Sequence, residues 1–189
     1  MVSIAIDGPS GAGKSSLAKA LAKDMGYVYV DTGAMYRSIG LYAVRAGVDP
    51  HDAAAVTALL PEIQLDIRLE DGTQHIYLNG EDVSTAIRAE NIGMAASAVA
   101  AHPAVRSFLL DTQRGLAKSQ NILMDGRDIG TVVLPNATVL ADIQQRDYQD
   151  SHRAVAPLKQ AEDAILVDTS SIGLQESFDL LKRTILAHI

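Results

Sequence analysis

The chain contains no cysteine, no long apolar run and no excess of basic residues, and each absence excludes a class of protein. Without cysteine, neither disulfide bonds nor thiolate metal sites can form. No apolar run reaches the roughly 20 residues that a membrane-spanning helix needs. The formal net charge of −7 argues against a protein that coats nucleic acid, because such proteins usually carry a basic face. We therefore expect a cytoplasmic protein without a membrane or nucleic-acid partner.

Several catalytic and regulatory signatures are also missing. The five histidines lack the spacing of metal ligands, which indicates surface or hairpin residues. No serine nucleophile with a partnered histidine is evident, and no Asn-Lys-x-Asp guanine-reading motif occurs, which disfavours a regulatory GTPase. The apolar run at residues 2–6 predicts a strand that opens the fold rather than a signal peptide. A length of 189 residues suits one domain, and we expect a monomer.

The most informative motif present is G-x-x-x-x-G-K-S, which lies between the apolar run at 2–6 and a helical pattern that extends to about Met25. A strand, a glycine-rich loop and a helix in this order form the setting of a phosphate-binding loop. Backbone N–H groups and the helix start would bind a polyphosphate, with the Lys14 ammonium beside the terminal phosphates and the Ser15 hydroxyl on a magnesium ion. The alternative is a plain glycine-rich turn. The predicted nucleotide-binding residues are Gly8, Pro9, Ser10, Gly11, Ala12, Gly13, Lys14, Ser15 and Ser16.

Apolar runs and helical patterns alternate along much of the chain, which predicts an α/β fold with a parallel sheet flanked by helices. Ligands of such a sheet bind at the carboxyl ends of its strands, where the loops at Gly8, Asp31 and Asp125 should converge. The expected strands are residues 2–6, 27–30, 121–124 and 164–167, and the expected helices are residues 16–25, 34–46 and 174–187.

One segment of the chain departs from this alternation of strands and helices. Residues 64–69 and 75–78 alternate apolar and polar side chains around Asp-Gly and Asn-Gly turns, which predicts an antiparallel hairpin. We expect an inserted lobe at about residues 64–101, and helical spacing over residues 90–118 with Pro103 starting a second helix. Only residues 52–61 are biased enough in composition to suggest a linker.

Arginines near strand ends and on one helical face are candidates for holding phosphate. Arg37 follows the second strand and is either a phosphate ligand or an exposed helix arginine. Arg127 lies between two glycines after the third strand, a pattern that favours a site over a plain turn. Arg146, Asp150 and Arg153 share one helical face and could close over a phosphorylated ligand, although Arg146 and Asp150 alone would suggest a surface ion pair.

These parts suit phosphoryl transfer, whose transition state needs in-line positioning and dispersed positive charge. A lysine, a magnesium ion and several arginines supply that charge. Asp125, at the end of the third strand, is either the acidic partner of the magnesium ion or a turn-forming aspartate.

Four motifs together resemble those of the bacterial cytidylate kinases, within the nucleoside monophosphate kinase family. The motif at 6–15 is shared by many proteins, whereas those at 31–37, 124–131 and 146–157 in this order are specific to these kinases. The resemblance implies a P-loop NTPase-type sheet with an inserted lobe that binds the nucleoside monophosphate. It also implies ATP as phosphoryl donor, Mg²⁺ as cofactor, and CMP or dCMP as acceptor.

The resemblance further implies which residues bind the nucleoside of the acceptor. Ser97, Arg106 and Asp128 match residues that face the cytosine, and Arg146 and Asp150 match a pair that reaches the ribose hydroxyls. Cytosine offers an amino donor to a carboxylate and two acceptors to an arginine, whereas uracil would present an oxygen to that carboxylate. Mismatched buried polar groups of this kind can reject an analogue by about 10⁴–10⁵-fold.

Phosphate-binding roles follow from the same resemblance. Arg37, Arg127 and Arg153 match arginines that hold phosphate, and Thr32 matches a residue near the nucleotide. The predicted catalytic residues are Lys14, Arg127 and Arg153, and the predicted metal-binding residues are Ser15 and Asp125.

The chain departs from the family after Val139. There, family members complete a core strand and continue into an arginine-rich lid helix that covers the triphosphate. Here Leu140 follows at once and begins a stretch, residues 140–146, that is typical of a helix. We therefore expect the lid segment to be missing between Val139 and Leu140, either truly deleted or present in a longer form of the protein.

Two other functions remain open. A kinase for another small acceptor, such as shikimate or a different nucleoside monophosphate, would share the phosphate-binding loop. A lidless module that binds nucleotide but has little or no catalytic activity would share the loop and act through a partner.

Overall fold

The computed structural model describes residues 1–8, 13–70, 73–144 and 161–189, with the backbone alone at residues 69, 70, 73 and 139–144. The chain divides into two compact units. The first, here called the sheet unit, comprises residues Met1–Asp31 and Arg114–Ile189, and the second, the hairpin unit, comprises Thr32–Gln113. Each unit is described by itself.

The sheet unit is built on five parallel strands in the order β2-β6-β1-β7-β8, which confirms the predicted α/β fold. Strand β1 is central, and the motif-bearing ends of its neighbours align with it, since Ile6 pairs with Asp125 of β6 and Asp125 pairs with Asp31 of β2. The carboxyl ends of these strands therefore lie at one edge, as expected. The strands are β1 Ser3–Asp7, β2 Val28–Asp31, β6 Ile122–Gly126, β7 Val139–Gln144 and β8 Ile165–Asp168.

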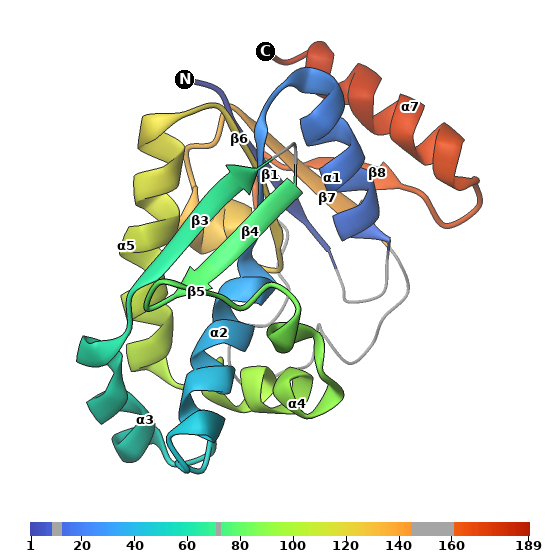
Figure 1. Cartoon of the computed structure of the whole chain (residues 1–189). Helices are drawn as coiled ribbons and strands as arrows, with labels where there is room; N and C mark the ends of the chain where they lie inside the picture. The colour runs from blue at the N-terminus through green and yellow to red at the C-terminus, as the bar shows by residue number, and fades with distance from the viewer. Residues whose placement is uncertain (9–12, 71–72, 145–160) are drawn as a thin grey trace. The chain divides into compact units, whose positions relative to one another are not determined.

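Helices α1 (Lys14–Met25) and α7 (Leu174–Leu186) lie side by side in the sheet unit (Figure 1). Both helices carry apolar stripes that pack with strand residues in one core cluster, in agreement with the helical periodicity of the sequence. An ion pair of 2.7 Å joins Lys182 of α7 to Asp24 of α1. The buried members of this cluster include Ile4, Ile6, Leu17, Leu21, Leu123, Leu181 and Ile185.

The hairpin unit contains the predicted antiparallel strands, β3 (Leu65–Glu70) and β4 (Thr73–Leu78), followed by the short strand β5 (Glu81–Asp82). Asn79 and Gly80 connect β4 to β5 with φ angles of 50° and 84°. Positive φ at both positions is the requirement of a type I′ turn, which explains the Asn-Gly sequence.

Helical segments share one apolar core with this sheet in the hairpin unit, and Pro103 begins the helix α5 as expected. The division between the units falls inside that helix, after Gln113. The helical segments are α2 Thr32–Arg45, α3 Ala53–Leu59, η1 Leu60–Glu62, η2 Ala86–Arg88, α4 Glu90–Val99 and α5 Pro103–Ser119.

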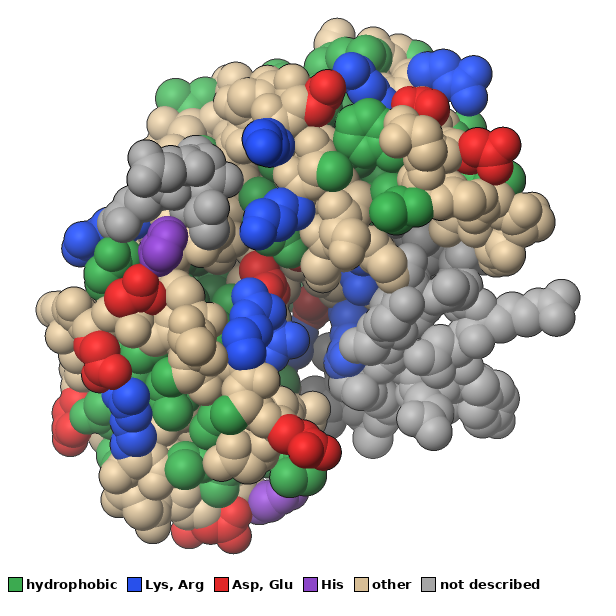
Figure 2. Space-filling view, turned by 45° about the vertical axis from the view of Figure 1, so that its right-hand side comes forward, with side chains coloured by type: hydrophobic (Ala, Val, Ile, Leu, Met, Phe, Trp, Pro, Cys, Tyr) green, Lys and Arg blue, Asp and Glu red, His purple; other side chains and the backbone are tan. Residues whose placement is uncertain are grey.

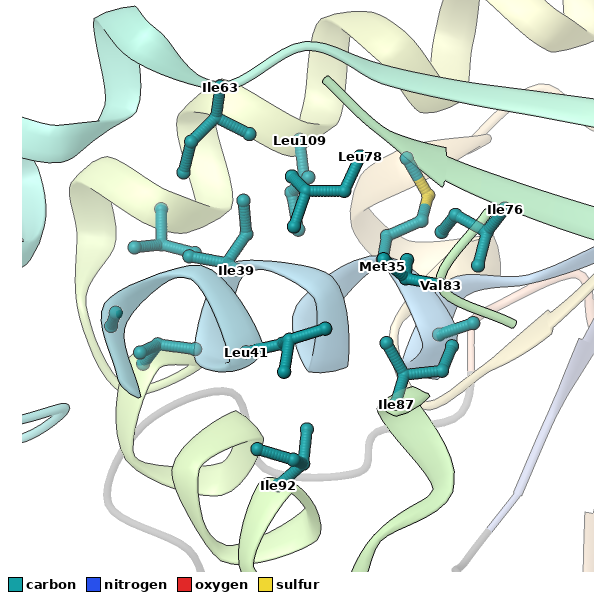
Figure 3. Packing of buried hydrophobic residues seen from close by; sticks show 14 of the residues in the cluster. Met35, Ile39, Leu41, Ile63, Ile76, Leu78, Val83, Ile87, Ile92 and Leu109 are labelled. Carbon is teal, nitrogen blue, oxygen red and sulfur yellow. The ribbon is translucent and has the colours of Figure 1, made fainter. Parts of the chain in front are cut away.

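The core of the hairpin unit gathers around helix α2. Met35 and Ile39 of this helix are almost fully buried and point among side chains from the strands and from α5, including Ile76 and Leu109 (Figure 3). On another side of α2, a Cβ at Gly40 would lie 2.9 Å from the backbone nitrogen of Ala96 in α4. The close contact of α2 with α4 thus depends on a glycine.

Two expectations about local structure are wrong. Residues 52–61 are not a linker but hold helix α3, because Asp52 accepts hydrogen bonds from the amides of Ala54 and Ala55 at 3.0 Å and the alanine run favours a helix. Residues 140–144 do not begin a helix but complete strand β7, which pairs with β1 on one side and β8 on the other. Hydrogen bonds to two neighbouring strands outweigh the local helical pattern there.

Charged side chains of both signs are interspersed among the described residues on the face shown in Figure 2. This surface agrees with the absence of a basic bias in the sequence. Of the helices that the structure describes, none has both the length and the apolar character that crossing a membrane requires.

Candidate functional site

The described ends of the phosphate-binding motif have the backbone geometry that glycine allows. Gly8 has φ of 150° and Gly13 has φ of 72°, and helix α1 begins at the next residue, Lys14. The Gly13 carbonyl accepts hydrogen bonds from the amides of Ser16 and Leu17, both at 3.1 Å, which start the helix. Between these ends, the predicted ligands Pro9, Ser10, Gly11 and Ala12 lie outside the described residues.

Ser15 and Asp125 meet although 110 residues separate them in the sequence. The Ser15 hydroxyl donates to one carboxylate oxygen of Asp125 at 2.7 Å, and the Tyr29 hydroxyl donates to the other at 3.0 Å. Asp125 is therefore more than a turn residue, because its carboxylate is buried and held by two hydroxyl groups. A hydroxyl and a carboxylate beside a phosphate-binding loop are oxygen ligands of the kind that Mg²⁺ prefers, so the predicted metal residues fit that ion chemically.

Burial raises the pKa of the Asp125 carboxyl, and the nearby charge of Asp31 raises it further. The Ser15 hydrogen bond, the Lys14 ammonium and the Tyr29 hydroxyl act in the opposite direction. Burial, followed by the charge of Asp125, raises the pKa of Tyr29 as well, so its hydroxyl stays protonated and can donate. The site thus holds an ionisable carboxyl in a setting that favours a nearby cation.

Lys14 is the cation of this group that the structure describes in place. Its side chain is only 8% exposed, in the first turn of α1, and it influences the carboxyl of Asp125 electrostatically. A buried lysine beside a helix start is positioned to meet anionic phosphate, since the amides of the first turn also carry partial positive charge. Ser16, the next predicted ligand after Ser15, is exposed.

The segment after β6 carries two further predicted residues. Arg127 and Asp128 follow Gly126 at the carboxyl end of the strand, and both are half-buried. Directly after them, a π-helical turn, η3 (Ile129–Val133), begins. The sheet unit therefore places five predicted residues at the start of α1, at the end of β6 and directly after β6: Lys14, Ser15, Asp125, Arg127 and Asp128.

Four predicted acceptor residues belong to the hairpin unit. Thr32 is buried at the first position of α2, and Arg37 lies half-buried one turn further along this helix. Arg106 is half-buried in the first turn of α5.

Ser97 is exposed on α4 and lines a groove of about 760 Å³ within the hairpin unit. Among the described residues that line this groove, no arginine occurs, so the groove does not by itself supply a phosphate ligand. Its lining consists of His51, Glu90, Gly93, Met94, Ser97, Ala98, Ala101 and His102.

The remaining predicted residues lie outside the described part of the chain. These are Arg146, Asp150 and Arg153, which were expected to share one helical face. Their roles stay predictions.

Sequence reasoning missed three side chains that shape the site. Asp7 stands inside the phosphate-loop motif but was not assigned a role, and its carboxylate binds backbone amides after Asp128. Tyr29 looked like one more residue of a buried strand, although an aromatic residue with a hydroxyl two positions before a strand end is a usable signal. Arg114 gave no signal, because its partners are backbone carbonyls 18 and 19 residues away.

Comparison with known proteins yields one consistent family. The family model for cytidylate kinase matches residues 4–140 and 137–186. A cytidylate kinase of Caldicellulosiruptor bescii is 40% identical over 93% of this chain and 91% of its own length. Cytidylate kinases of Geobacillus sp. and Nocardia farcinica are 41% and 43% identical, over 94% and 98% of this chain and 93% and 94% of their own lengths.

The alignments also show a difference in length. The alignment with the Nocardia farcinica protein extends over 218 positions, whereas the chain has 189 residues, so the relative carries residues without a counterpart here. The two stretches matched by the family model overlap at residues 137–140.

Proposed function

Because the chain belongs to the cytidylate kinase family, we propose that it transfers the γ-phosphoryl group of ATP to CMP or dCMP, giving CDP or dCDP and ADP. The chain is a nucleoside monophosphate kinase, and ATP is the phosphoryl donor of the family. The observation that carries the proposal is the hydrogen bond of Ser15 to Asp125 beside the buried Lys14, at the start of the helix that follows the phosphate-binding motif.

In this proposal the sheet unit binds the donor. The amides of the loop at residues 8–13 and the Lys14 ammonium bind the ATP phosphates. Ser15 and Asp125 hold Mg²⁺, Ser15 through its hydroxyl and Asp125 directly or through water. The bound ion would neutralise charge on the phosphate oxygens during transfer.

The acceptor is recognised by the cytosine-reading residues implied by the family resemblance. Asp128 accepts from the exocyclic amino group of cytosine, and Arg106 donates to its ring nitrogen and carbonyl oxygen, with Ser97 as a further contact. Arg146 and Asp150 bind the ribose. UMP would place an oxygen against the Asp128 carboxylate, which accounts for the proposed preference for cytosine.

The reaction needs no covalent intermediate. The negative charge that spreads over the transferred group is stabilised by Lys14, Arg127 and Arg153. The phosphate group of the acceptor nucleotide is held by Arg37 and Thr32. Electrostatic stabilisation of this kind is usually the largest catalytic contribution to phosphoryl transfer.

A second function is favoured by the alignments: a nucleotide-binding module with low turnover. The family resemblance implies a lid after the strand that contains Val139, and the two matched stretches overlap at residues 137–140 while the relatives are longer. Both findings support a missing lid near residues 137–140, where residues 140–144 complete strand β7 instead of starting the next helix. Without a lid, the transition-state arginines that it carries are lost and water enters the site, so turnover falls more than binding.

A coupled assay of ADP release with CMP, dCMP, UMP and AMP tests the proposal, together with calorimetric binding of ATP and CMP to the same preparation. We expect turnover with CMP and dCMP and little with UMP. Preference for AMP or a non-nucleotide acceptor would contradict the proposal. Binding of ATP and CMP without turnover would select the second function.

Three smaller expectations accompany the proposal: a monomer, a cytoplasmic location and no nucleic-acid partner. Light scattering during gel filtration would measure the first. A mass of about twice the calculated 20.1 kDa would contradict it.

A further inference from the structure

The turn η3 is held at its beginning by a carboxylate from a distant part of the sheet unit. Asp7 ends strand β1 and is only 6% exposed. One of its carboxylate oxygens accepts from the amide of Ile129 at 2.8 Å and the other from the amide of Gly130 at 2.7 Å. Both bonds are buried and involve a carboxylate, so they belong to the stronger class of hydrogen bonds.

The end of the same turn is held by a guanidinium group. Arg114 of helix α5 donates from Nε to the carbonyl of Val133 at 3.0 Å and from Nη2 to the carbonyl of Val132 at 2.9 Å. Two donors of one planar group thus fix two successive carbonyls.

The signs of the two charges match the turn that they hold. The free amides at the start of a helical turn attract a negative charge, and the free carbonyls at its end attract a positive one. Asp128 lies at the start of this turn, because its carbonyl accepts from the amides of Val132 and Val133 at 2.9 and 3.2 Å. The position of Asp128, and of Arg127 before it, therefore depends on where η3 is held.

We propose that Asp7 and Arg114 are positioning residues for recognition of the acceptor nucleotide: they hold η3 from both ends and thereby set Arg127 and Asp128 against the phosphate and the cytosine. The inference rests on the proposed function, since it takes Asp128 as the reader of cytosine. Asp7 also directly precedes Gly8, so one carboxylate joins the start of the donor loop to the segment that reads the acceptor.

The test compares Asp7→Asn and Arg114→Met with the unchanged chain. Asparagine keeps the size of aspartate but has one acceptor oxygen and no charge, so one of the two buried amides loses its acceptor and the other keeps only a neutral one. Calorimetry gives the dissociation constants of CMP and UMP, which need no turnover. We expect each variant to reduce the preference for CMP over UMP about tenfold, since small misplacements of binding groups cost up to about 10²-fold.

Controls separate positioning from general loss of stability. Asp24→Asn and Arg183→Met make the same chemical changes at more exposed sites on α1 and α7 and should keep the preference. Arg114→Lys, which keeps the charge, should lose less than Arg114→Met. The double variant should lose less than the product of the two single losses, because both residues act on one turn.

Hydrogen exchange at residues 127–134 provides a readout that does not depend on ligand. We expect faster exchange there in both variants and unchanged exchange in the controls. Folded variants that keep the CMP preference within about twofold of the parent would overturn the inference. If Asp7→Asn does not fold, the two Arg114 variants decide the question.

A parent chain that binds CMP no better than UMP would contradict the proposed function itself. In that case exchange alone decides whether Asp7 and Arg114 hold η3. Unchanged exchange in both variants would then overturn this inference as well.

Discussion

At the scale of single residues, Asp125 combines a proposed functional role with a cost in stability. Its carboxyl is buried, lies near the negative charge of Asp31, and has a raised pKa for these reasons. The same carboxylate is the proposed partner of Mg²⁺. A cation-binding site is expected to be electrostatically unfavourable in the ligand-free protein, because no positive charge then offsets the buried carboxylate.

Replacing Asp125 by asparagine should therefore stabilise the ligand-free chain while weakening nucleotide binding. The asparagine can still meet the hydroxyls of Ser15 and Tyr29, but the buried charge is gone. We expect the melting temperature at pH 7 to rise by about 2–4 °C, the change that roughly 1 kcal/mol produces in a chain of this size. Mg²⁺-dependent ATP binding should fall about tenfold or more. Scanning calorimetry and ATP titration check both, and a lower melting temperature would contradict the assigned cost.

Lys14→Ala should reduce kcat by about 100- to 1,000-fold, because one preorganised charge at the transferred group commonly contributes that much. The matched control is Lys19→Ala, on the same helix but exposed. Steady-state rates with ATP and CMP measure the effect. Near-normal turnover in the Lys14 variant would remove this residue from the mechanism.

At the scale of elements, the contact between α2 and α4 depends on Gly40. An alanine there would bring its Cβ to 2.9 Å from the nitrogen of Ala96 and 3.1 Å from the Cβ of Ala95. We expect Gly40→Ala to lower the free energy of unfolding by about 1–3 kcal/mol, as overpacked cores do.

Gly115→Ala is the matched control, because a Cβ at this exposed position of α5 meets no atom within 4 Å. It should raise the free energy of unfolding by up to about 1 kcal/mol through helix propensity alone. Urea unfolding of both variants measures the contrast. If both variants changed the free energy of unfolding by the same amount and in the same direction, the α2–α4 contact would accommodate a methyl group without strain, contrary to the 2.9 Å distance.

The end of the β-hairpin has a built-in sensitivity to acid. Hydrogen bonds from the side chain and backbone of Ser84, and then from His75, lower the pKa of Asp82 from 3.8 to about 2. A lowered pKa in the folded state means that this carboxylate stabilises the fold above pH about 4 and loses that effect as the pH falls through about 2.

Asp82→Asn should therefore destabilise the chain most above pH 4, with the difference from the parent shrinking toward pH 2. Thermal unfolding at a series of pH values measures this difference. A difference that stays constant from pH 7 to pH 2 would exclude the ionised carboxylate as its cause. Arg45 also lowers the pKa of the neighbouring Glu81. Because Glu81 is present in both proteins, its contribution to the pH dependence cancels when the variant is compared with the parent.

At the scale of the whole molecule, binding and turnover should respond differently to the lid. Inserting the segment that the Nocardia farcinica relative carries without a counterpart here after Gln144, where β7 ends, should raise kcat with CMP by about 10²-fold or more if that segment supplies the missing charge stabilisation and exclusion of water. The dissociation constant of ATP should change far less. An insert of glycine and serine of equal length is the control, and equal kcat values for the two inserts would contradict a catalytic role of the lid.

Motifs confined to a few residues allowed the most reliable sequence predictions. The order of strand, glycine-rich loop and helix predicted the start of α1, the Asn79-Gly80 pair predicted its hairpin turn, and Pro103 predicted the start of α5. Residues 52–61 carry the same kind of signal, an N-capping aspartate and an alanine run, but their biased composition also favours a linker, and composition alone does not separate the linker from helix α3.

The sequence by itself determined the fold class and the order of most elements, and it is the source of the prediction that Lys14 and Ser15 bind the donor. These depend on backbone preferences and side-chain patterns that act over one or two turns. Only the tertiary structure decided that residues 140–144 form a strand, that Tyr29 meets Asp125, and that Asp7 meets the amides of η3. Apart from the pairing of β7 with β8, the partners in these contacts are separated by about 100 residues or more, and no local preference specifies which distant group will satisfy a buried donor or acceptor.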